Sequence, residues 1–537
     1  MTDSIRGEDE QVMQQRLVAS LLRGAAHPAP PPGRIEHVET HISHVLLVGD
    51  RAYKIKKPLN LGFLDFTGLD RRRHYCEEEI RLNRRLAPEL YLDCVPINGS
   101  PEAPRLGGDP QTAIEFAVCM RRFEQSALLD RVAATGGLTA QLIGALTESL
   151  ASFHAAAPRA PESRFGEPTQ VLAPMLDNFT HTRPLLRDPA ALQNLEAVET
   201  WTRARAAALV EILDGRRRDG HVRECHGDVH LGNVALIDGR PVLFDCVEFN
   251  DDFRWIDTMS DLGFLLMDLD ARGLPNLGWL ALNVYLEHGG DYPGLAVLPL
   301  YRCYRAMVRA KVAAIRASQG ELSALADCHR YLNLARQYTE TAPPAVALTQ
   351  GLSGSGKTTV SGLLCPALGA VRIRSDVERK RLFGYAPEQS AAAEPGAGIY
   401  RRETSERVYR HLAELADAAL AAGFNVVIDA ANLRRCQRAL LAAAARQRGV
   451  PLVYLLCQAP EASLRDWLQQ RARQGGDASD ADEAVLAEQI ASAEPLGPDE
   501  GPALTLATRE PLDAAELARR VRQAWQAERL AGTAGHE

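Results

Sequence analysis

The chain has 537 residues, more than the roughly 250 to 300 residues that a single hydrophobic core supports, so at least two domains are expected. Apolar residues make up 46% of the chain and charged residues 24%, which is typical of soluble globular proteins. The net charge of −8 excludes a general attraction to nucleic acid or anionic membranes.

The cysteine pattern and the absence of long apolar runs predict the cellular location of the protein. The ten cysteines occur singly, with no C-x-x-C pair and no zinc-type Cys/His spacing, so we expect neither disulfides nor a zinc site. No apolar run approaches the roughly 18 residues of a membrane span, and the first residues, MTDSIRGEDEQ, lack a signal peptide's apolar core. We therefore expect a reduced, cytoplasmic protein.

Two proline-rich stretches predict the domain organisation. Residues 1–34 end in AAHPAPPPG, which predicts a flexible N-terminal segment. The run TETAPPAVALTQG follows a long helical pattern and precedes a short apolar strand, which predicts a linker at 341–345. We expect one domain at 35–340, a second at 346–530, and a tail at 531–537.

The first domain opens with a predicted hairpin that carries lysines. In HVLLVGDRAYKIKKPLN the turn falls at Gly49 and Asp50, and Lys54 and Lys56 share one face of the second strand because strand side chains alternate. Lys54 is the candidate for binding ATP phosphates, with Lys56 as the alternative. In the next helical stretch, Glu79 borders the apolar stripe and is the candidate to pair with the lysine.

The segment CHGDVHLGNVALIDGRPVLFDCVEF carries the strongest chemical pattern in this domain. Its H-G-D-x-x-x-x-N run, followed by a short hairpin and an aspartate, matches a kinase catalytic loop and metal-binding aspartate in order and spacing. Asp228 is the predicted catalytic residue that orients or deprotonates an acceptor hydroxyl, and Asn233 and Asp245 are the predicted Mg²⁺ ligands. His226 is expected to brace the loop.

Acidic residues also follow the predicted metal site. Glu248, Asp251 and Asp252 are most simply a solvated acidic turn, with a site that suits a cationic acceptor as the alternative. The stretch Ile114–Phe123 reads as a strand and hinge whose backbone would meet adenine.

These features resemble the aminoglycoside phosphotransferase family, which includes choline-type and other small-molecule kinases. The resemblance covers about residues 35–340 and implies an α+β bilobal kinase-like fold that uses ATP and Mg²⁺. No G-x-G-x-x-G loop precedes Lys54, which argues against a protein kinase. FDCVEF also replaces the commoner I-D-W type sequence at Asp245, a departure that concerns the substrate.

The second domain begins with a phosphate-binding loop. An apolar strand precedes GLSGSGKTT and a helical pattern follows it, which is the context that gives the G-x-x-x-x-G-K-T motif its meaning. The predicted ATP-binding residues are Gly351, Ser353, Gly354, Ser355, Gly356, Lys357, Thr358 and Thr359, and the Thr358 hydroxyl is also a predicted Mg²⁺ ligand.

Acidic and basic side chains complete this predicted site. Asp429 ends the apolar run of GFNVVIDAAN and is the predicted second Mg²⁺ ligand, with a helix N-cap or turn as the alternative. In VRIRSDVERK, Asp376 is the predicted acid-base residue, with an N-cap again as the alternative, and Arg379 is the predicted substrate-binding residue. Arg471, in a helix with further arginines, is predicted to close a lid on ATP, with an exposed helix face as the alternative.

This part resembles the small P-loop kinases, which include gluconate kinase, polynucleotide 5′-hydroxyl kinase and the zeta-toxin kinases. The resemblance implies an α/β P-loop NTPase fold with a parallel sheet and phosphoryl transfer from ATP. As a whole, the sequence resembles bacterial two-domain proteins described as phosphotransferase-like and AAA-type ATPases.

The predicted function is a bifunctional ATP-dependent kinase acting on hydroxyl groups of small molecules, with a sugar, aminosugar or amino alcohol at the N-terminal site. The alternatives are a nucleotide-sensing regulatory ATPase and a C-terminal polynucleotide 5′-hydroxyl kinase. The latter ranks lower because residues 345–537 show no basic groove interleaved with aromatic residues.

Overall fold

The computed structural model describes residues 2–24, 34–62, 64–160, 164–386, 389, 402–474 and 483–534. It divides the chain into two compact units, each built from several segments. The first comprises Met1–Ser149, Phe153–Glu167 and Arg217–Asp261, and the second comprises Leu150–Ser152, Pro168–Arg216 and Leu262–Glu537. This division does not fall at the predicted linker, because helices that precede the linker pack together with the strands that follow it.

The first unit is built on a six-stranded antiparallel sheet of order β1-β2-β3-β6-β4-β5. The strands are β1 (Glu36–Glu39), β2 (Ser43–Val48), β3 (Arg51–Lys56), β4 (Tyr91–Gly99), β5 (Pro104–Leu106) and β6 (Glu115–Arg121). The predicted turn at Gly49 joins β2 to β3 with a φ of 58° at this glycine. Lys54 on β3 pairs with Val45 on one side and Val118 on the other, so it lies in the middle of the sheet.

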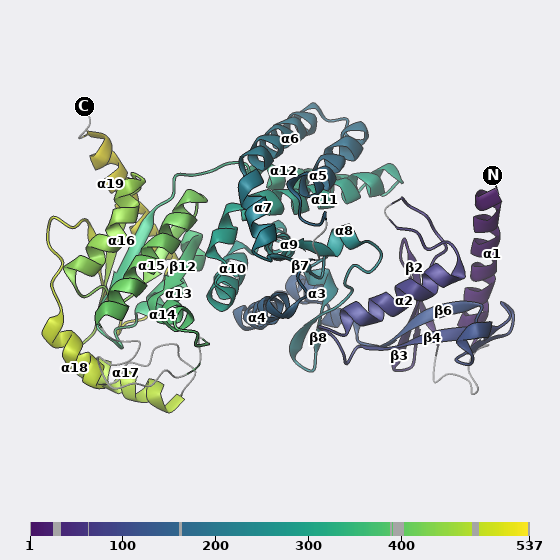
Figure 1. Ribbon diagram of the computed structural model, residues 1–537, viewed down its shortest axis with the longest axis horizontal. Helices are drawn as coiled ribbons and strands as arrows, with labels where there is room; N and C mark the ends of the chain where they lie inside the picture. Colours follow the sequence, from purple (N-terminus) through teal and green to yellow (C-terminus); the bar gives the residue numbers. More distant parts are fainter. Residues whose placement is uncertain are drawn as a thin grey trace. The chain divides into compact units, whose positions relative to one another are not determined.

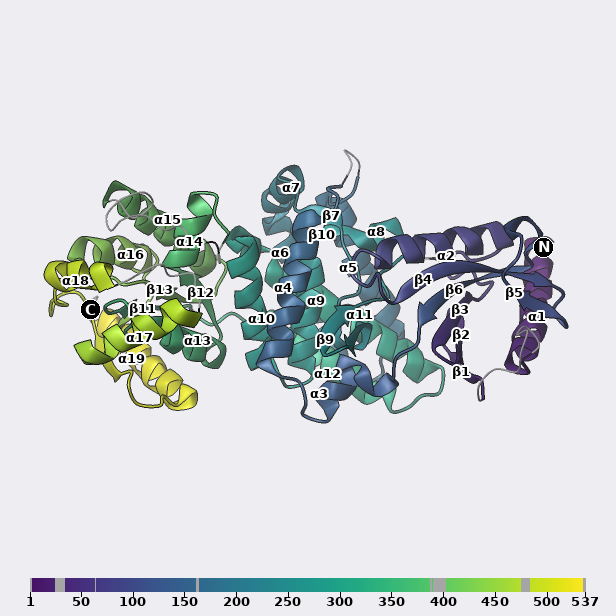
Figure 2. The ribbon, with the colours of Figure 1, turned by 90° about the horizontal axis from the view of Figure 1, so that it is seen from below.

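Two helices pack on opposite faces of this sheet (Figure 2). Helix α2 (Leu69–Asn83) carries Glu79 and packs through Cys76 and Ile80 on the face of β4 and β6. Helix α1 (Thr2–Leu22) occupies much of the segment expected to be flexible. Its apolar positions fall at helical spacing around Leu17 and Leu21, and burial of these residues against β2 and β3 gives the helix a partner that its sequence alone does not reveal.

Short elements of the first unit carry the kinase-like loop. They are α3 (Leu129–Ala134), α4 (Ala140–Ala156), β7 (Val222–Glu224), β8 (Val234–Ile237), β9 (Arg240–Leu243), α8 (Asp251–Arg254) and β10 (Trp255–Asp257). Strands β8 and β9 form the hairpin predicted between Asn233 and Asp245, and β7 pairs with β10.

The second unit contains a helical bundle. Its helices are α5 (Pro168–Thr182), α6 (Pro189–Ala208), α7 (Val210–Arg218), α9 (Thr258–Ala271), α10 (Pro275–Gly289), α11 (Leu298–Ser318) and α12 (Ala324–Gln337), with α7 ending and α9 beginning in the first unit. Buried residues of α5, α6, α9, α11 and α12, among them Phe264, Met307 and Tyr331, form one hydrophobic core.

The same unit contains a five-stranded sheet in which all neighbouring strands are parallel, in the order β12-β13-β11-β14-β15. The strands are β11 (Val346–Gln350), β12 (Ala370–Arg374), β13 (Asn425–Asp429), β14 (Leu452–Gln458) and β15 (Ala503–Ala507). The flanking helices are α13 (Lys357–Leu368), α14 (Ser375–Leu382), α15 (Arg402–Ala421), α16 (Arg435–Gln447), α17 (Glu461–Gln474), α18 (Glu483–Ser492) and α19 (Ala514–Ala534).

Helices α13 and α19 share a hydrophobic core with the central strands β11, β13 and β14. Helix α15 packs against α16 and contacts β12 and β13, and the group of α13 to α16 around this sheet is visible in Figure 1. The predicted α/β fold with a parallel sheet is confirmed, and the central strand β11 leads directly into the predicted phosphate loop. Among the described residues, no helix is long and apolar enough to cross a membrane.

Candidate active sites

The first candidate site centres on Lys54, which lies between two carboxylates. Its Nζ donates hydrogen bonds to Glu79 Oε1 at 2.8 Å and to Asp245 Oδ1 at 2.7 Å. Burial alone would lower the pKa of Lys54, but Asp245 and Glu79 outweigh burial and raise the pKa well above its usual range. The structure thus brings together the predicted lysine, its predicted partner and a predicted metal ligand from three separate elements.

The alternative lysine, Lys56, lies beside the same glutamate but is fully buried. Its Nζ donates to Glu79 Oε2 at 2.6 Å and also contacts Glu248. Burial would raise the pKa of Glu79, but Lys54 and Lys56 together lower it to about 2. Glu248 is 4% exposed, and burial raises its pKa. Lys56 therefore holds Glu79 from the interior, and Glu248 does not face an acceptor.

The other acidic residues proposed for a cationic acceptor also have partners. Asp251 forms an ion pair with Arg254, and Asp252 accepts from Arg164 at 2.9 Å. These pairs give the acidic turn a structural explanation that does not require a cationic substrate.

The predicted catalytic loop is held by its own side chains. Asn233 Nδ2 donates to Asp228 Oδ2 at 2.9 Å and to Asp228 O at 3.0 Å. His226 is buried; its Nε2 lies 2.9 Å from Phe244 O, and its Nδ1 accepts from the Asp228 N–H at 3.3 Å. Burial lowers the pKa of His226, in keeping with a neutral ring that donates on one side and accepts on the other.

A buried aspartate anchors the start of the same loop. Asp261 Oδ2 and Oδ1 accept from the backbone N–H groups of His226 and Gly227, both at 2.8 Å. Gly227 has a φ of 89°, and a Cβ there would lie 2.6 Å from Phe253 O, so this position requires glycine. The loop conformation that presents Asp228 is therefore set by contacts behind it.

Asp245 adopts a backbone conformation that is uncommon for a residue other than glycine, with a φ of 65°. Its N–H donates to the Tyr91 hydroxyl oxygen at 3.2 Å, and the next N–H, of Cys246, donates to Asn83 Oδ1 at 2.9 Å. The Asp245 side chain is 41% exposed. Its carboxylate and the amide oxygen of Asn233 are hard oxygen donors of the type that Mg²⁺ prefers, so these residues fit a metal site.

The second candidate site is the phosphate loop between β11 and α13. Gly354 and Gly356 have φ values of 79° and 78°. At Gly351 a Cβ would lie 2.6 Å from Cys457 O and would also meet Ser355 Oγ. Ser355 Oγ is buried and has no hydrogen-bond partner among the described residues, and a phosphate oxygen would supply one. Lys357 Nζ donates to Leu352 O at 2.7 Å, across the loop.

Asp429 is the last residue of β13, beside the central strand. Its Oδ2 accepts from Ser361 Oγ at 2.9 Å, and Ser361 lies on α13, one helical turn beyond Thr358. No helix begins within five residues after Asp429, so the N-cap alternative for it is wrong. Its carboxylate is therefore tied to the helix that carries the Thr358 hydroxyl, an arrangement that fits a Mg²⁺ site.

Asp376 and Arg379 lie on the short helix α14. The N-cap position of α14 is occupied by Arg374, so Asp376 is inside the first turn and its N-cap alternative is also wrong. Arg379 is 8% exposed. Both residues follow β12, which neighbours β13 in the sheet.

Helices α17 and α18 contact the loop. Gln489 Oε1 accepts from the Ser353 N–H at 2.7 Å, and Leu464, Leu468 and Leu486 pack together against Leu352. The side chain of Arg471, predicted to bind ATP, lies outside the described residues. Arg465, on the same helix, pairs with Glu461 at 2.7 Å.

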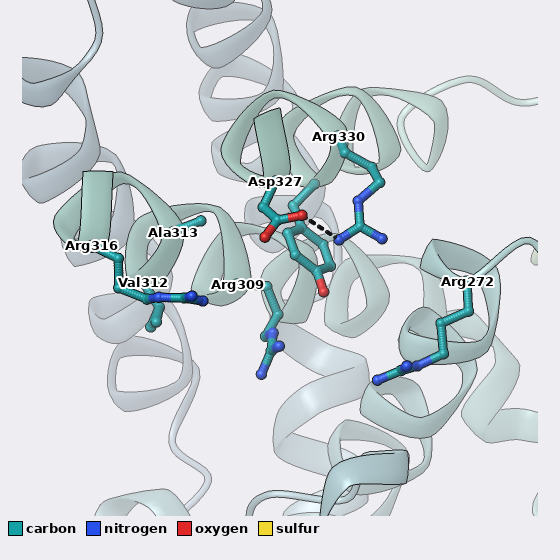
Figure 3. A pocket seen from close by; sticks show the side chains of 8 residues that line it. Arg272, Arg309, Val312, Ala313, Arg316, Asp327 and Arg330 are labelled. Carbon is teal, nitrogen blue, oxygen red and sulfur yellow. Dashed lines mark hydrogen bonds and ion pairs between the residues drawn. The ribbon is translucent and has the colours of Figure 1, made fainter. Parts of the chain in front are cut away.

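Two other polar groupings lie away from these sites. Several arginine side chains line a pocket of about 240 Å³ in the helical bundle (Figure 3). Arg330 pairs with Asp327 at 2.8 Å, and Arg272 with Asp268 at 3.0 Å, so carboxylates offset much of its charge. A second grouping, His37, Glu39 and His44, has a salt bridge from Glu39 to Lys57 at 2.7 Å.

Two protein-family models match separate parts of the chain. The Phosphotransferase enzyme family matches residues 64–298, and an AAA domain matches residues 346–496. A sugar kinase from Janibacter sp. HTCC2649 is 25% identical over 35% of this chain and 98% of its own, with a TM-score of 0.27. A choline/ethanolamine kinase family protein from Mesorhizobium loti is 14% identical over 60% of this chain and 99% of its own, with a TM-score of 0.36.

The two matched domains define an ATP-dependent phosphotransferase with a kinase-like first domain and a P-loop second domain. An uncharacterized protein of Mycobacterium tuberculosis H37Rv is 31% identical over 474 residues, covering 86% of this chain and 91% of that protein. The chain belongs to the same family as this mycobacterial protein.

Several residues around the sites have no signal in the sequence. Tyr91, Ser361 and Gln489 join the sites through contacts between distant elements. No local motif marks these three residues.

Proposed function

We propose that the chain is a bifunctional kinase in which each domain transfers a phosphoryl group from Mg-ATP to a hydroxyl group of a small molecule. The proposed catalytic domains are residues 35–340 and 346–530. The observation that carries the proposal is the position of Lys54, 2.8 Å from Glu79 and 2.7 Å from Asp245, in the same unit as Asp228.

At the N-terminal site, Asp228 would accept the proton of the acceptor hydroxyl while the acceptor oxygen attacks the γ-phosphorus. The bond from the γ-phosphorus to the bridging oxygen then breaks, and ADP leaves. Lys54, oriented by Glu79, would bind the phosphates. Bound Mg²⁺ supplies charge neutralisation on the phosphates, and Asn233 and Asp245 are the residues that would hold it.

At the C-terminal site, the backbone N–H groups of the loop 351–359 would surround the phosphates, with Lys357 binding the β and γ groups. Thr358 and Asp429 would hold Mg²⁺. Asp376 would accept the acceptor proton, and Arg379 would bind the acceptor. The buried, unpartnered hydroxyl of Ser355 supports an oxyanion ligand in this loop.

The N-terminal acceptor is proposed to be a sugar, aminosugar or amino alcohol. The Asp228 and Asp245 side chains are 38% and 41% exposed, whereas Glu79 is fully buried. A small polar molecule from solvent can therefore approach Asp228, while the ion pair between Lys56 and Glu79 remains buried. Because Glu248 is buried against Lys56, the acidic turn does not favour a cationic acceptor over a neutral one.

A regulatory ATPase is the second candidate, and one contact favours it. Gln489 from α18 already bonds to the Ser353 N–H in the phosphate loop, so nucleotide binding at that loop could be linked to movement of α17 and α18.

The experiment that tests these functions compares the full-length protein with Asp228→Asn and Lys357→Ala variants on a metabolite mixture supplied with radiolabelled ATP. We expect two labelled products, each lost in only one variant. ATP hydrolysis without any labelled product would support the regulatory ATPase. A labelled 5′-hydroxyl oligonucleotide that depends on Lys357 would instead identify the C-terminal domain as a polynucleotide kinase.

A further inference from the structure

Helix α10 contacts β12, the edge strand of the parallel sheet, and lies beside it in both views (Figures 1 and 2). Asn283 Nδ2 donates to Ala370 O at 3.0 Å, and Asn283 Oδ1 accepts from the Arg372 N–H at 2.6 Å. The Tyr292 hydroxyl donates to Arg372 O at 3.1 Å. These bonds replace the ones that a further strand would make, so β12 is fixed against α10.

Glu287 lies four residues after Asn283 and therefore on the same face of α10. Its Oε1 accepts from Arg372 Nε at 2.5 Å, and its Oε2 lies 3.5 Å from Arg374 Nη1. Burial would lower the pKa of Arg372, but Glu287 outweighs burial and raises it. A single carboxylate thus holds two arginines of the edge strand, in a site where Glu287 is 13% exposed.

Arg374 is also the neighbour of the proposed metal ligand. It pairs with Asp429 in the register of β12 and β13, and its Nε lies 3.9 Å from Asp429 Oδ2. The charges therefore alternate in the order Arg372, Glu287, Arg374, Asp429. Arg374 lies between these two carboxylates, so the charge on Glu287 opposes its attraction to Asp429.

We propose that Glu287 is a positioning residue for the C-terminal kinase site, because it draws Arg374 toward α10 and so leaves Asp429 to bind Mg²⁺. Without the charge on Glu287, Arg374 would be drawn more strongly to Asp429, and the guanidinium then competes with the metal ion. The inference rests on the proposed role of Asp429. Helix α10 lies within residues 64–298, which the phosphotransferase family matches, although it packs in the same unit as the parallel sheet. A residue of the phosphotransferase-like region would therefore influence Mg²⁺ binding at the C-terminal site.

The test uses the full-length chain carrying Lys54→Met and Asp228→Asn, which remove the proposed phosphate-binding lysine and the proposed proton acceptor of the N-terminal site. Calorimetric titration of ADP at a series of Mg²⁺ concentrations gives the Mg²⁺ requirement for nucleotide binding, and ATP turnover gives a second value. We expect Glu287→Gln to raise the half-saturating Mg²⁺ concentration roughly tenfold, with ADP affinity at saturating Mg²⁺ changed by less than about twofold. Adding Arg374→Gln to Glu287→Gln should restore the requirement of the parent, because the competing cation is gone.

Asn283→Ala is the matched control on the same helix face. It removes the bonds to β12 without changing any charge, so it should lower the melting temperature and leave the Mg²⁺ requirement unchanged. A Mg²⁺ requirement within twofold of the parent in Glu287→Gln overturns the proposal, as does failure of Arg374→Gln to restore it. If Glu287→Gln does not fold, Arg374→Gln alone decides: the proposal expects its Mg²⁺ requirement to fall below that of the parent, and an unchanged requirement overturns it.

Failure of the proposed function looks different. If ADP binding to the parent does not depend on Lys357, the C-terminal site itself has been misassigned and this inference falls with it. If binding depends on Lys357 and Glu287→Gln behaves as the parent, only the role of Glu287 is contradicted.

Discussion

Glu79 Oε2 accepts a hydrogen bond from Lys56 at 2.6 Å, while its other oxygen holds Lys54 at 2.8 Å. The two lysines share one carboxylate but differ in environment. The Lys56 side chain is fully buried, and the Lys54 side chain is 12% exposed and reaches Asp245. The pair therefore separates two tasks, support of the glutamate from the interior by Lys56 and, in the proposed function, contact with the phosphates by Lys54.

Replacing these lysines should separate stability from activity. Lys56→Met removes the lysine that contacts the buried Glu248 and leaves Glu79 with Lys54 alone, so we expect it to reduce the free energy of unfolding of the first unit by about 3–5 kcal/mol. Lys54→Met should reduce it less and should lower N-terminal kinase activity by roughly a hundredfold or more. Urea unfolding and product formation measure the two effects.

The neighbouring Lys57 is the matched control for both substitutions. Its ion pair is with Glu39, whose side chain is 57% exposed, so Lys57→Met should change the free energy of unfolding by less than about 1 kcal/mol. Equal losses of stability in the Lys56 and Lys57 variants would contradict the interior role of Lys56.

Gly351→Ala should abolish nucleotide binding by the phosphate loop. The new Cβ would lie 2.6 Å from Cys457 O and would also meet Ser355 Oγ, so the loop must move. Gly144→Ala in α4 is the control, because nothing lies within 4 Å of its Cβ, and it should raise helix stability by roughly 0.5–1 kcal/mol. Calorimetric titration with ADP distinguishes Gly351→Ala from the Gly144→Ala control. Unchanged ADP binding by Gly351→Ala would refute the close packing of this loop.

The stability of the first unit should depend on pH through His226. Burial holds its pKa below the ordinary value of 6.5, and its Nδ1 must stay unprotonated to accept from the Asp228 N–H. The unfolded chain therefore binds a proton more readily, so this contribution is complete above pH 6.5 and is lost as the pH falls toward the folded pKa. Urea unfolding across this pH range should show that the free energy of unfolding declines more steeply with falling pH for the wild type than for His226→Asn.

Tyr91→Phe should weaken the N-terminal site alone. The variant removes the hydroxyl oxygen that accepts the N–H of Asp245, a residue held at a φ of 65°. We expect a loss of about 1–3 kcal/mol in unfolding free energy and a lower N-terminal turnover number. ATP turnover that depends on Lys357 is the internal reference, and a decline in that turnover as well would indicate a general loss of folding.

Local motifs were enough to predict the fold classes and much of each site. The hairpin turn at Gly49, the strand face of Lys54 and the order of strand, loop and helix around Lys357 are all properties of short segments. Glu79 was found because helical periodicity places it at the edge of a buried stripe, and the structure brings it to Lys54. The Lys54–Glu79 contact was therefore accessible from the sequence.

The remaining contacts depend on tertiary packing. Helix α1 lies in a segment predicted to be flexible from the Pro/Ala stretch at its end, and the sequence of the helix does not reveal that its apolar positions meet β2 and β3. The sequence predicts that Glu248 lies in a solvated acidic turn or suits a cationic acceptor, and its burial depends on Lys56 of strand β3, which is distant in the sequence. Asn283 and Glu287 belong to no motif, since their roles depend on a strand almost ninety residues further along the chain.

The bonds from Asn283 to β12 also bear on how this protein can be divided. An edge strand with open N–H and C=O groups is a template for adding another strand, including one from a second molecule. A fragment beginning after the linker would lack α10 and would expose this edge of the sheet. We expect such a fragment to self-associate through β12, so the helices that precede the linker also act as a cover that keeps the P-loop sheet at five strands.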